Sequence, residues 1–410
     1  MLKLCHFPKC TDKIWYRPLR NITTKTPFDI DESDEEYKHF NTMYSEMFTS
    51  LDEKKVCNKD VSARSPRISD TDDLNNDLQD LFQIEQTPLS GVELRDKVKC
   101  SGRFIVRSLS HNPYYNLSLE DYIFRNTPVS KEVTNKIYPN HRLLFYINNK
   151  CAVIGKNQTI WQELYLSELK KQGYEVMRRL SGGGTVIHDM GNVNYSFITS
   201  RNEFHSNFFN ELIVKWLLSY DKTLPVTLNK RSDILYSGKK CSGSAFKIAQ
   251  GKAYHHGTML VKSDLNKFHG LLKPKDISGI HWDSASVDSV RSDISNISLP
   301  STDEFINICT DGFQNDFRGD NTSKIPIYYC DEINSINDEI TTTMNTLNSD
   351  SWKYFSGPKF KVDFKDKTLS ISCEKGVITE SSISSLIGTD FKKLAEDEEF
   401  FTERIYNKPF

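Results

Sequence analysis

The chain has 410 residues, with 53 Lys and Arg against 55 Asp and Glu and a formal net charge of -2. This near balance gives no bulk electrostatic reason to expect nucleic acid or a membrane surface as a partner. No apolar run approaches the roughly 20 residues that a membrane-spanning helix requires, so a soluble protein of two or three domains is expected. The nine cysteines include no C-x-x-C pair, which predicts reduced thiols, no disulfide framework and no structural zinc.

Residues 1–98 are expected to precede the folded domains. Up to Phe28 six basic residues face one acid, Asp12, a composition typical of a mitochondrial targeting segment. Pro8 and Pro18 interrupt any long amphipathic helix there, so a disordered basic tail is the alternative. An acidic run, DIDESDEEY, follows, and the chain stays polar to about residue 80. This composition predicts a disordered linker, with no packed core before about residue 98.

Residues 100–298 are expected to form an α+β domain, because strand and helix periods alternate along them. The asparagines at 148 and 149 tolerate positive φ, which indicates a hairpin turn between two apolar strands. Gly173 marks the end of the helix that follows. The elements expected before the glycine-rich stretch are a strand at 103–108, a helix at 116–125, strands at 143–147 and 151–154, and a helix at 161–172.

The next stretch holds Gly182, Gly183 and Gly184 between two apolar runs, which predicts a strand, a glycine turn and a strand. Consecutive glycines lose much conformational freedom on folding, so they indicate a sharp bend or close contact with a ligand. Freed N–H groups and the fork of Arg179 would suit phosphate oxygens. Arg178, one residue earlier, should point to the opposite face and form a surface ion pair. The alternative is a glycine-rich hairpin with surface arginines, since neither a dinucleotide fingerprint nor a P-loop is present.

Beyond the turn, apolar residues at 208, 212, 216 and 217 share the face of a helix expected at 204–220. A strand at 233–236 and a tight turn at Ser237 and Gly238 then deliver Lys239, expected to be solvated, and Lys240. The other elements expected here are a strand at 253–261 pairing with 233–236, a helix at 265–272 and a mobile polar loop at 281–288.

The C-terminal part is expected to be a polar linker at 300–324 and a small α+β accessory domain at 325–410. No catalytic group of residues is evident in that domain. Its expected elements are a helix at 328–347, a hairpin of strands 360–364 and 368–373, a strand at 375–378 and a helix near 391–401.

Two long strings carry a family resemblance. The first is Arg179-x-x-Gly-Gly-Gly, closed by His188, Asp189, Gly191 and Asn192; the second is Lys240-Cys241-Ser242-Gly243-Ser244-Ala245, followed by His255-His256-Gly257-Thr258 and Leu260. In order and spacing they resemble the lipoate-protein ligases, relatives of the biotin ligases. The resemblance extends from about Ser108 to Asn296, with a weaker echo at the C-terminus. It implies the fold of biotin ligases and class II synthetases, a mixed, mostly antiparallel sheet flanked by helices.

The resemblance also implies site residues. Lys240 is the expected catalytic residue, touching both a nucleotide phosphate and an acyl carboxylate. A structural hydrogen-bonding role is expected of His188, and Cys241 is expected in the core rather than as a nucleophile. His255 and His256 face opposite ways on a strand, and the sequence does not decide which approaches the ligand. The candidate ATP- or substrate-binding residues are Arg179, Gly182, Gly183, Gly184, Thr185, Val186, Ile187, His188, Asp233, Lys240 and His256, with no protein-held metal.

By resemblance, the enzyme is an ATP-dependent lipoate-protein ligase that joins lipoate or octanoate to lysines through an acyl-adenylate, with Mg²⁺ accompanying ATP. The implied partners are lipoyl domains of 2-oxoacid dehydrogenase E2 subunits and the glycine cleavage H protein, in the mitochondrial matrix or else the cytoplasm. Ser232 stands where bacterial members carry asparagine, which leaves the nucleotide contacts of Asp233 open. The alternatives are a transferase using acyl-CoA or preformed lipoyl-AMP, a biotin ligase, and a non-catalytic lipoyl-binding homologue.

Overall fold

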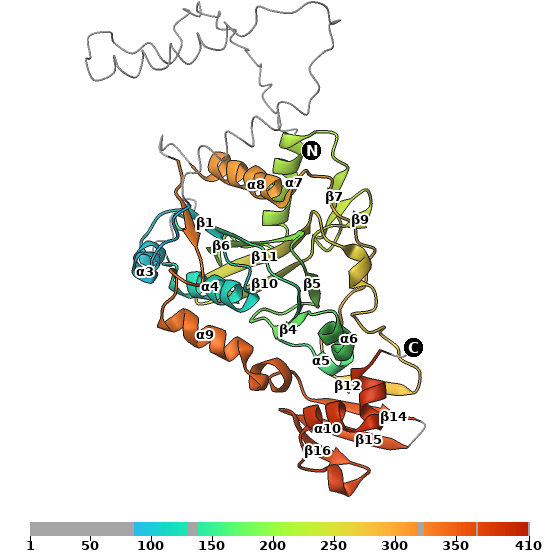
Figure 1. Ribbon diagram of the computed structural model, residues 1–410. Coiled ribbons are helices and arrows are strands. Elements are labelled where there is room, and N and C mark those ends of the chain that lie inside the picture. Colours follow the sequence, from blue (N-terminus) through green and yellow to red (C-terminus); the bar gives the residue numbers. More distant parts are fainter. Residues whose placement is uncertain (1–85, 130–137, 319–323, 366–367, 409–410) are drawn as a thin grey trace, which may run out of the picture. The chain divides into compact units, whose positions relative to one another are not determined.

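A computed structural model describes residues 86–129, 138–318, 324–365 and 368–408 (Figure 1). All of them belong to one compact unit, Ile84–Phe410. The predicted targeting segment and most of the acidic linker lie outside the described residues. None of the helices in the described ranges is long and apolar enough to span a membrane.

A six-stranded sheet forms the centre of this unit, in the order β10-β11-β6-β2-β1-β13. The pairs β1–β2 and β1–β13 are parallel and the other three are antiparallel. The predicted α+β class with a mixed, mostly antiparallel sheet is therefore confirmed. The strands are β1 (Phe104–Ser108), β2 (Arg142–Tyr146), β6 (Asn192–Ser200), β10 (Ser244–Ala249), β11 (Lys252–Leu260) and β13 (Ile327–Cys330).

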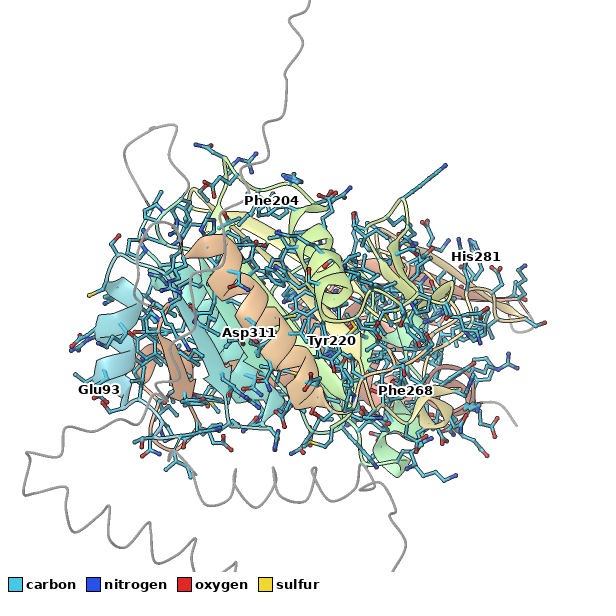
Figure 2. All side chains as sticks on the ribbon, turned by 90° about the horizontal axis from the view of Figure 1, so that it is seen from above. Glu93, Phe204, Tyr220, Phe268, His281 and Asp311 are labelled. Atoms are coloured by element: carbon cyan, nitrogen blue, oxygen red, sulfur yellow. The ribbon has the colours of Figure 1, made fainter. Side chains whose placement is uncertain are left out.

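Helices cover both faces of the sheet. On one face, α7 (Phe208–Tyr220) and α8 (Thr302–Phe317) lie side by side, as Tyr220 and Asp311 mark in Figure 2. Their aromatic side chains pack with those of β6 in one core, as the helical spacing in α7 predicts. On the other face, α4 (Pro113–Asn126) and α9 (Asp338–Asn348) pack against each other, and α3 (Gly91–Lys99) lies beside them (Figure 1).

Two segments expected to be linkers are helices. In α3, Ser90 and Glu93 form a capping box and Leu94 and Val98 are fully buried, so the folded region begins before residue 98. The second is α8, inside the expected linker 300–324. Ser301 caps it, and apolar side chains at helical spacing enter the core. In both cases a capped helix buries one apolar stripe, although the average composition of the segment is polar.

Several pairings differ from the expected ones because partners come from distant parts of the chain. The strands expected as a hairpin at 143–147 and 151–154 lie in different sheets, since Asn148 is buried and bonded by its side chain rather than exposed in a turn. The start of the expected helix 328–347 is instead β13, which pairs with β1. The strand expected to pair with 253–261 pairs with neighbouring short strands. Two three-stranded sheets result: β4-β3-β5 (Glu175–Arg178, Cys151–Ile154, Val186–His188) and β7-β8-β9 (Val226–Leu228, Ile234–Tyr236, Lys239–Lys240).

The C-terminal sheet takes one strand from the predicted loop 281–288. This strand, β12 (Ile280–Ser284), pairs with β14 (Phe360–Phe364), in the order β12-β14-β15-β16. The apolar residues of this sheet share a core with the helices that precede the glycine turn. The expected helix 161–172 is broken where Tyr165 N–H donates to the Leu271 carbonyl, and only Leu265–Phe268 of the expected helix 265–272 is helical. The remaining α-helices and β-strands are α5 (Ile160–Glu163), α6 (Leu166–Lys171), β15 (Leu369–Glu374), β16 (Val377–Ser381), α10 (Phe391–Asp397) and α11 (Glu399–Phe401).

Lys273 joins the C-terminal segment to α5. Its Nζ is fully buried and donates to the carbonyl oxygens of Trp161, at 2.5 Å, and Ile405. Within the described residues no carboxylate pairs with it. Burial lowers the pKa of Lys273 to about 7. A neutral amine still carries two N–H donors, enough for both carbonyls.

Stability should therefore depend on pH through Lys273. The unfolded chain keeps this amine protonated up to its ordinary pKa of 10.5, whereas the folded chain releases the proton from about pH 7. Between these values the unfolded state binds more protons, so stability rises with pH. Relative to Lys273→Met, the free energy of unfolding of the natural protein should rise by up to about 1.4 kcal/mol per pH unit between pH 7.5 and 9. Urea unfolding curves measure the free energies of both proteins. The prediction is contradicted if the natural protein and Lys273→Met differ by the same amount at both pH values.

Candidate active site

The glycine turn connects β4 to β5 and is held by its own arginine. Arg179 is buried and donates to Ser181 Oγ at 3.0 Å and to the carbonyl oxygens of Gly182 and Gly184 at 2.5 and 2.8 Å. It also donates to the Val153 carbonyl at 3.1 Å. Burial lowers the pKa of Arg179 to about 10, so it stays cationic at neutral pH. Most of its donors thus fix the shape of the turn, although it was expected to meet phosphate oxygens.

Only some of the glycines are required by the geometry. Gly183 has a φ of +89°, in the left-handed region, and a Cβ there would lie 2.9 Å from Arg179 Nη2. Gly155, after β3, faces the turn so closely that a Cβ would lie 1.9 Å from the Gly183 carbonyl oxygen. A Cβ at Gly182, by contrast, would meet nothing within 4 Å.

Gly155→Ala and Gly182→Ala form a matched pair. Gly155→Ala should cost about 1–3 kcal/mol of stability, because the added methyl group forces the two backbones apart. Gly182→Ala should change stability by less than about 0.5 kcal/mol. Thermal unfolding of both variants measures this. Equal effects of the two substitutions would contradict the packing argument.

Lys240 reaches the site from the hairpin of β8 and β9. Ser237 and Gly238 turn the chain with positive φ, and the two lysines that follow alternate, so that Lys239 is exposed and Lys240 points inward. Its Nζ lies 2.7 Å from Asp233 Oδ1. The other oxygen of this buried carboxylate accepts from Asn229 Nδ2 at 3.0 Å.

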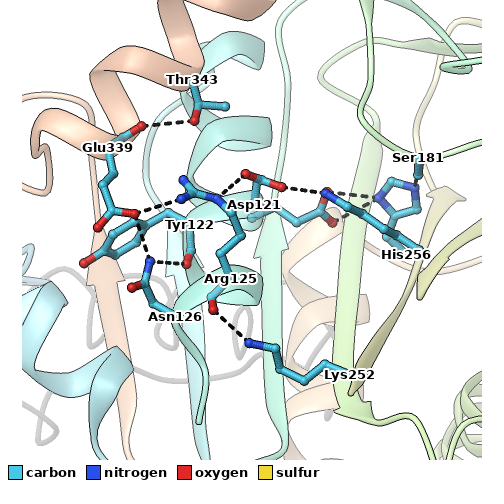
Figure 3. Close-up of polar contacts among 11 residues, drawn as sticks. Asp121, Tyr122, Arg125, Asn126, Ser181, Lys252, His256, Glu339 and Thr343 are labelled. Atoms are coloured by element: carbon cyan, nitrogen blue, oxygen red, sulfur yellow. Dashed lines mark hydrogen bonds and ion pairs between the residues drawn. The ribbon is translucent and has the colours of Figure 1, made fainter. Parts of the chain in front are cut away.

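The adjacent histidines take opposite faces of β11. His256 faces the site: its Nδ1 lies 3.0 Å from Glu120 Oε1 and its Nε2 lies 2.8 Å from Ser181 Oγ (Figure 3). His255 is buried among aromatic rings, including that of Phe246. Burial lowers the pKa of His255 to about 3. Of the two histidines, His256 is therefore the one expected to approach a ligand.

Two cavities meet at Lys240. Cavity A has a volume of about 260 Å³ and cavity B about 400 Å³. Lys240, Thr185 and Val186 line both, so the lysine and the glycine turn share one hollow. Among the predicted site residues, all of which are described, Gly182 alone lines neither cavity. Residues lining cavity A only include Ile187, Leu260, Leu265, Phe268, Leu272 and Arg291; those lining cavity B only include Leu117, Tyr146, Val153, Arg179, Gly183, Gly184, His188, Arg231, Asp233, Phe246 and His256.

Comparison with known proteins identifies the family of the chain. A profile of the lipoyl protein ligase A/B catalytic domain matches residues 112–314. A candidate lipoate-protein ligase A of Saccharomyces cerevisiae (strain ATCC 204508 / S288c) is 47% identical over 380 residues, covering 90% of this chain and 91% of that protein. The chain belongs to the lipoate-protein ligase A family. The human lipoyl amidotransferase LIPT1, mitochondrial, is 36% identical over 189 residues, 46% of this chain and 48% of that protein.

A lipoate-protein ligase fold is also found among solved structures. The crystal structure of Plasmodium falciparum LipL1 in complex with lipoate superposes with a TM-score of 0.51 and 24% identity, covering 74% of this chain and 94% of that one. This likeness supports the fold alone. The family profile runs on into α8, which places that helix with the catalytic domain rather than in a linker.

Four residues that hold this lipoate-protein ligase site together, Ser289, Glu163, Gln158 and Glu120, are not among the predicted site residues. Ser289 Oγ accepts from the Thr185 N–H at 2.8 Å and donates to Glu163 Oε2 at 2.6 Å, so the loop after β12 is fastened over the glycine turn. Gln158 Nε2 donates to the same hydroxyl at 3.0 Å. The fourth residue is the buried Glu120, whose carboxylate bonds to His256 Nδ1. Glu120 and Glu163 are acids inside apolar segments of the sequence. This position could have indicated a role for them, since a charge is rarely buried without a partner.

Cys241 is among the residues lining cavity A, but its thiol is buried in the core. Its Sγ is fully buried and donates to the Ile234 carbonyl at 3.4 Å. Burial raises the pKa of Cys241 to about 12. The thiol therefore stays protonated, as expected for a core residue. Within the described ranges no group of three or more His, Cys, Asp or Glu side chains is placed to hold a metal ion.

Proposed function

We propose that this enzyme joins lipoate, or octanoate, to the ε-amine of a lysine on a lipoyl domain, through an acyl-adenylate made from ATP. The observation that carries the proposal is the place of Lys240 where the two cavities meet. A cation at that junction can neutralise an acyl carboxylate and an α-phosphate together. ATP enters as its magnesium complex and is a substrate.

The linings favour one assignment of the two ligands. The lining of cavity B includes buried apolar side chains such as Leu117 and Val153, which suit an acyl chain, beside charged groups such as Lys240 that suit its carboxylate. Residues 185–187, along which the family resemblance places the nucleotide, line cavity A together with Arg291. The acyl carboxylate then lies beside Lys240 with its chain directed toward His188.

Two steps complete the reaction. A carboxylate oxygen attacks the α-phosphorus, and the bond to pyrophosphate breaks, giving acyl-adenylate and pyrophosphate. The neutral acceptor amine then attacks the acyl carbon, the bond to AMP breaks, and the amine loses its proton as the amide forms. Lys240 offsets charge that develops on phosphate, and the fixed turn keeps the two reacting groups adjacent, which supplies most of the acceleration.

Intact-mass measurement of an apo lipoyl domain tests the proposal. The protein is incubated with that domain and lipoate plus ATP, octanoyl-CoA, or synthetic lipoyl-AMP. We expect the domain to gain one lipoyl group with ATP and free lipoate. No gain with any donor would leave a non-catalytic lipoyl-binding protein, and a gain with octanoyl-CoA or lipoyl-AMP but not with ATP and lipoate would identify a transferase.

The transferase is the second candidate. It is favoured by the human relative, which is named a lipoyl amidotransferase, and by Ser232 in place of asparagine. The geometry of Ser232 weakens the latter point. Ser232 has a φ of +63°, its hydroxyl bonds to Asn207, and it lines neither cavity. Asparagine is favoured at such a φ for backbone reasons, so the difference need not concern the nucleotide.

We further propose that the acceptors are lipoyl domains of 2-oxoacid dehydrogenase E2 subunits and the glycine cleavage H protein, in the mitochondrial matrix. The basic, acid-poor first 28 residues support this location, as does the mitochondrial name of the human relative. Microscopy of the protein with a fluorescent tag at its C-terminus, with and without residues 1–28, tests it. A cytoplasmic signal for the full chain would overturn the assignment.

A further inference from the structure

His188 lines cavity B and has one ring nitrogen without a hydrogen-bond partner in the described protein. This histidine ends β5, is 3% exposed, and lines the cavity that we assign to the acyl chain. Its Nδ1 lies 3.1 Å from Asn148 Nδ2 and 3.6 Å from Cys151 Sγ, and both of these groups can donate to it. Its Nε2 is buried and has no hydrogen-bond partner in the described protein.

Neighbouring amides fix which nitrogen carries the proton. Asn116 Nδ2 lies 2.8 Å from the Ser110 carbonyl oxygen, which can only accept, so this end of the Asn116 amide is its donor. The same group lies 2.9 Å from the amide of Asn148, which must therefore turn its oxygen toward Asn116. The amino group of Asn148 is then left to donate to His188 Nδ1.

The ring of His188 is consequently neutral, with its proton on Nε2. A protonated Nδ1 would oppose the N–H of Asn148. Burial, together with the charges of Arg179 and His256, lowers the pKa of His188 to about 3, so the ring remains neutral at working pH. Arg179, which also lines cavity B, donates to carbonyl oxygens of the turn, whereas the Nε2–H of His188 has no acceptor among the described residues.

We propose that this Nε2–H donates a hydrogen bond to a sulfur atom of the dithiolane ring of lipoate, so that cavity B prefers lipoate to octanoate. The inference rests on the proposed function, which places the carboxylate at Lys240 and the far end of the chain toward His188. Sulfur is a weak acceptor, whereas the methyl end of octanoate is none. Octanoate therefore leaves a buried donor unpaired, which disfavours its binding.

Calorimetric titration of the full-length protein with free lipoate and free octanoate tests this proposal without requiring catalysis. His188→Phe keeps a planar ring but removes the donor, so the ratio of lipoate to octanoate affinity should fall about 3- to 10-fold. His188→Gln retains an N–H donor on a side chain of similar reach and should keep most of the preference. Melting temperatures of both variants establish that they fold.

An unchanged ratio in His188→Phe, or equal losses for both acids, would overturn the proposal and leave His188 a residue that only shapes the cavity. Failure of the natural protein to bind either acid would instead overturn the proposed function, which is a different result. The tautomer has its own readout. Two-bond nitrogen–proton spectra of histidine-labelled protein should show His188 protonated at Nε2, and protonation at Nδ1 would refute the assignment.

Discussion

Replacing Lys240 with alanine should reduce lipoate-dependent exchange between ATP and pyrophosphate by about 10²- to 10³-fold or more, the effect typical of losing one group that stabilises developing charge. The reason lies in the position of the ammonium group, at the junction of both cavities and 2.7 Å from Asp233. Lys239→Ala is the matched control, because that lysine follows the same turn but is exposed. It should exchange at the natural rate.

The ion pair must be separated from catalysis in this experiment. Lys240→Ala leaves a buried carboxylate without its cation, which should cost roughly 1–3 kcal/mol of stability. The double variant Lys240→Ala with Asp233→Asn removes that unpaired charge and should recover stability without recovering exchange. Near-normal exchange in folded Lys240→Ala would refute the role of this lysine, and with it the basis of the proposed function.

The sequence could predict those parts of the site that depend on local strings and strand alternation. A strand period of two suffices to turn Lys239 outward and Lys240 inward, and to separate His255 from His256. The glycine turn and Lys240 do line one cavity, as the two strings together imply.

What the sequence could not predict depends on partners far along the chain. The strand β12 pairs with β14 in the C-terminal sheet, and β13 pairs with β1 in the central sheet. Both pairings are non-local, and no residue of either strand indicates its partner. Arg179 illustrates a different limit: its residue type suits an anion, yet the carbonyls around it decide where its donors point. Strand alternation places Arg178 on the face away from the cavity, but a distant segment covers that face, so the expected surface ion pair is wrong.

Arg178→Met should destabilise the protein by about 3–5 kcal/mol, the range for breaking a buried charged network. The guanidinium is fully buried and donates to the carbonyl oxygens of Gln158, at 2.7 Å, and Lys353, at 2.9 Å. The Arg178 carbonyl also accepts a hydrogen bond, from Trp352 Nε1 at 2.8 Å. Without Arg178 these buried carbonyls lose their partners, which costs more than the absent bonds themselves. Urea unfolding measures the loss.

The same substitution should also weaken lipoate binding, although Arg178 lines neither cavity. The segment it holds carries Gly155, packed against Gly183, and Gln158, bonded to Ser289 over the turn. Arg178→Lys keeps the charge but cannot span carbonyls on two segments, so it should fall between the natural protein and Arg178→Met. Arg95→Met, at an exposed position on α3, should leave both stability and binding unchanged. If Arg178→Lys matches the natural protein in stability and lipoate binding, the charge alone suffices and the bonding geometry is irrelevant. If Arg178→Met unfolds at the same urea concentration as the natural protein, the arginine does not join the two segments.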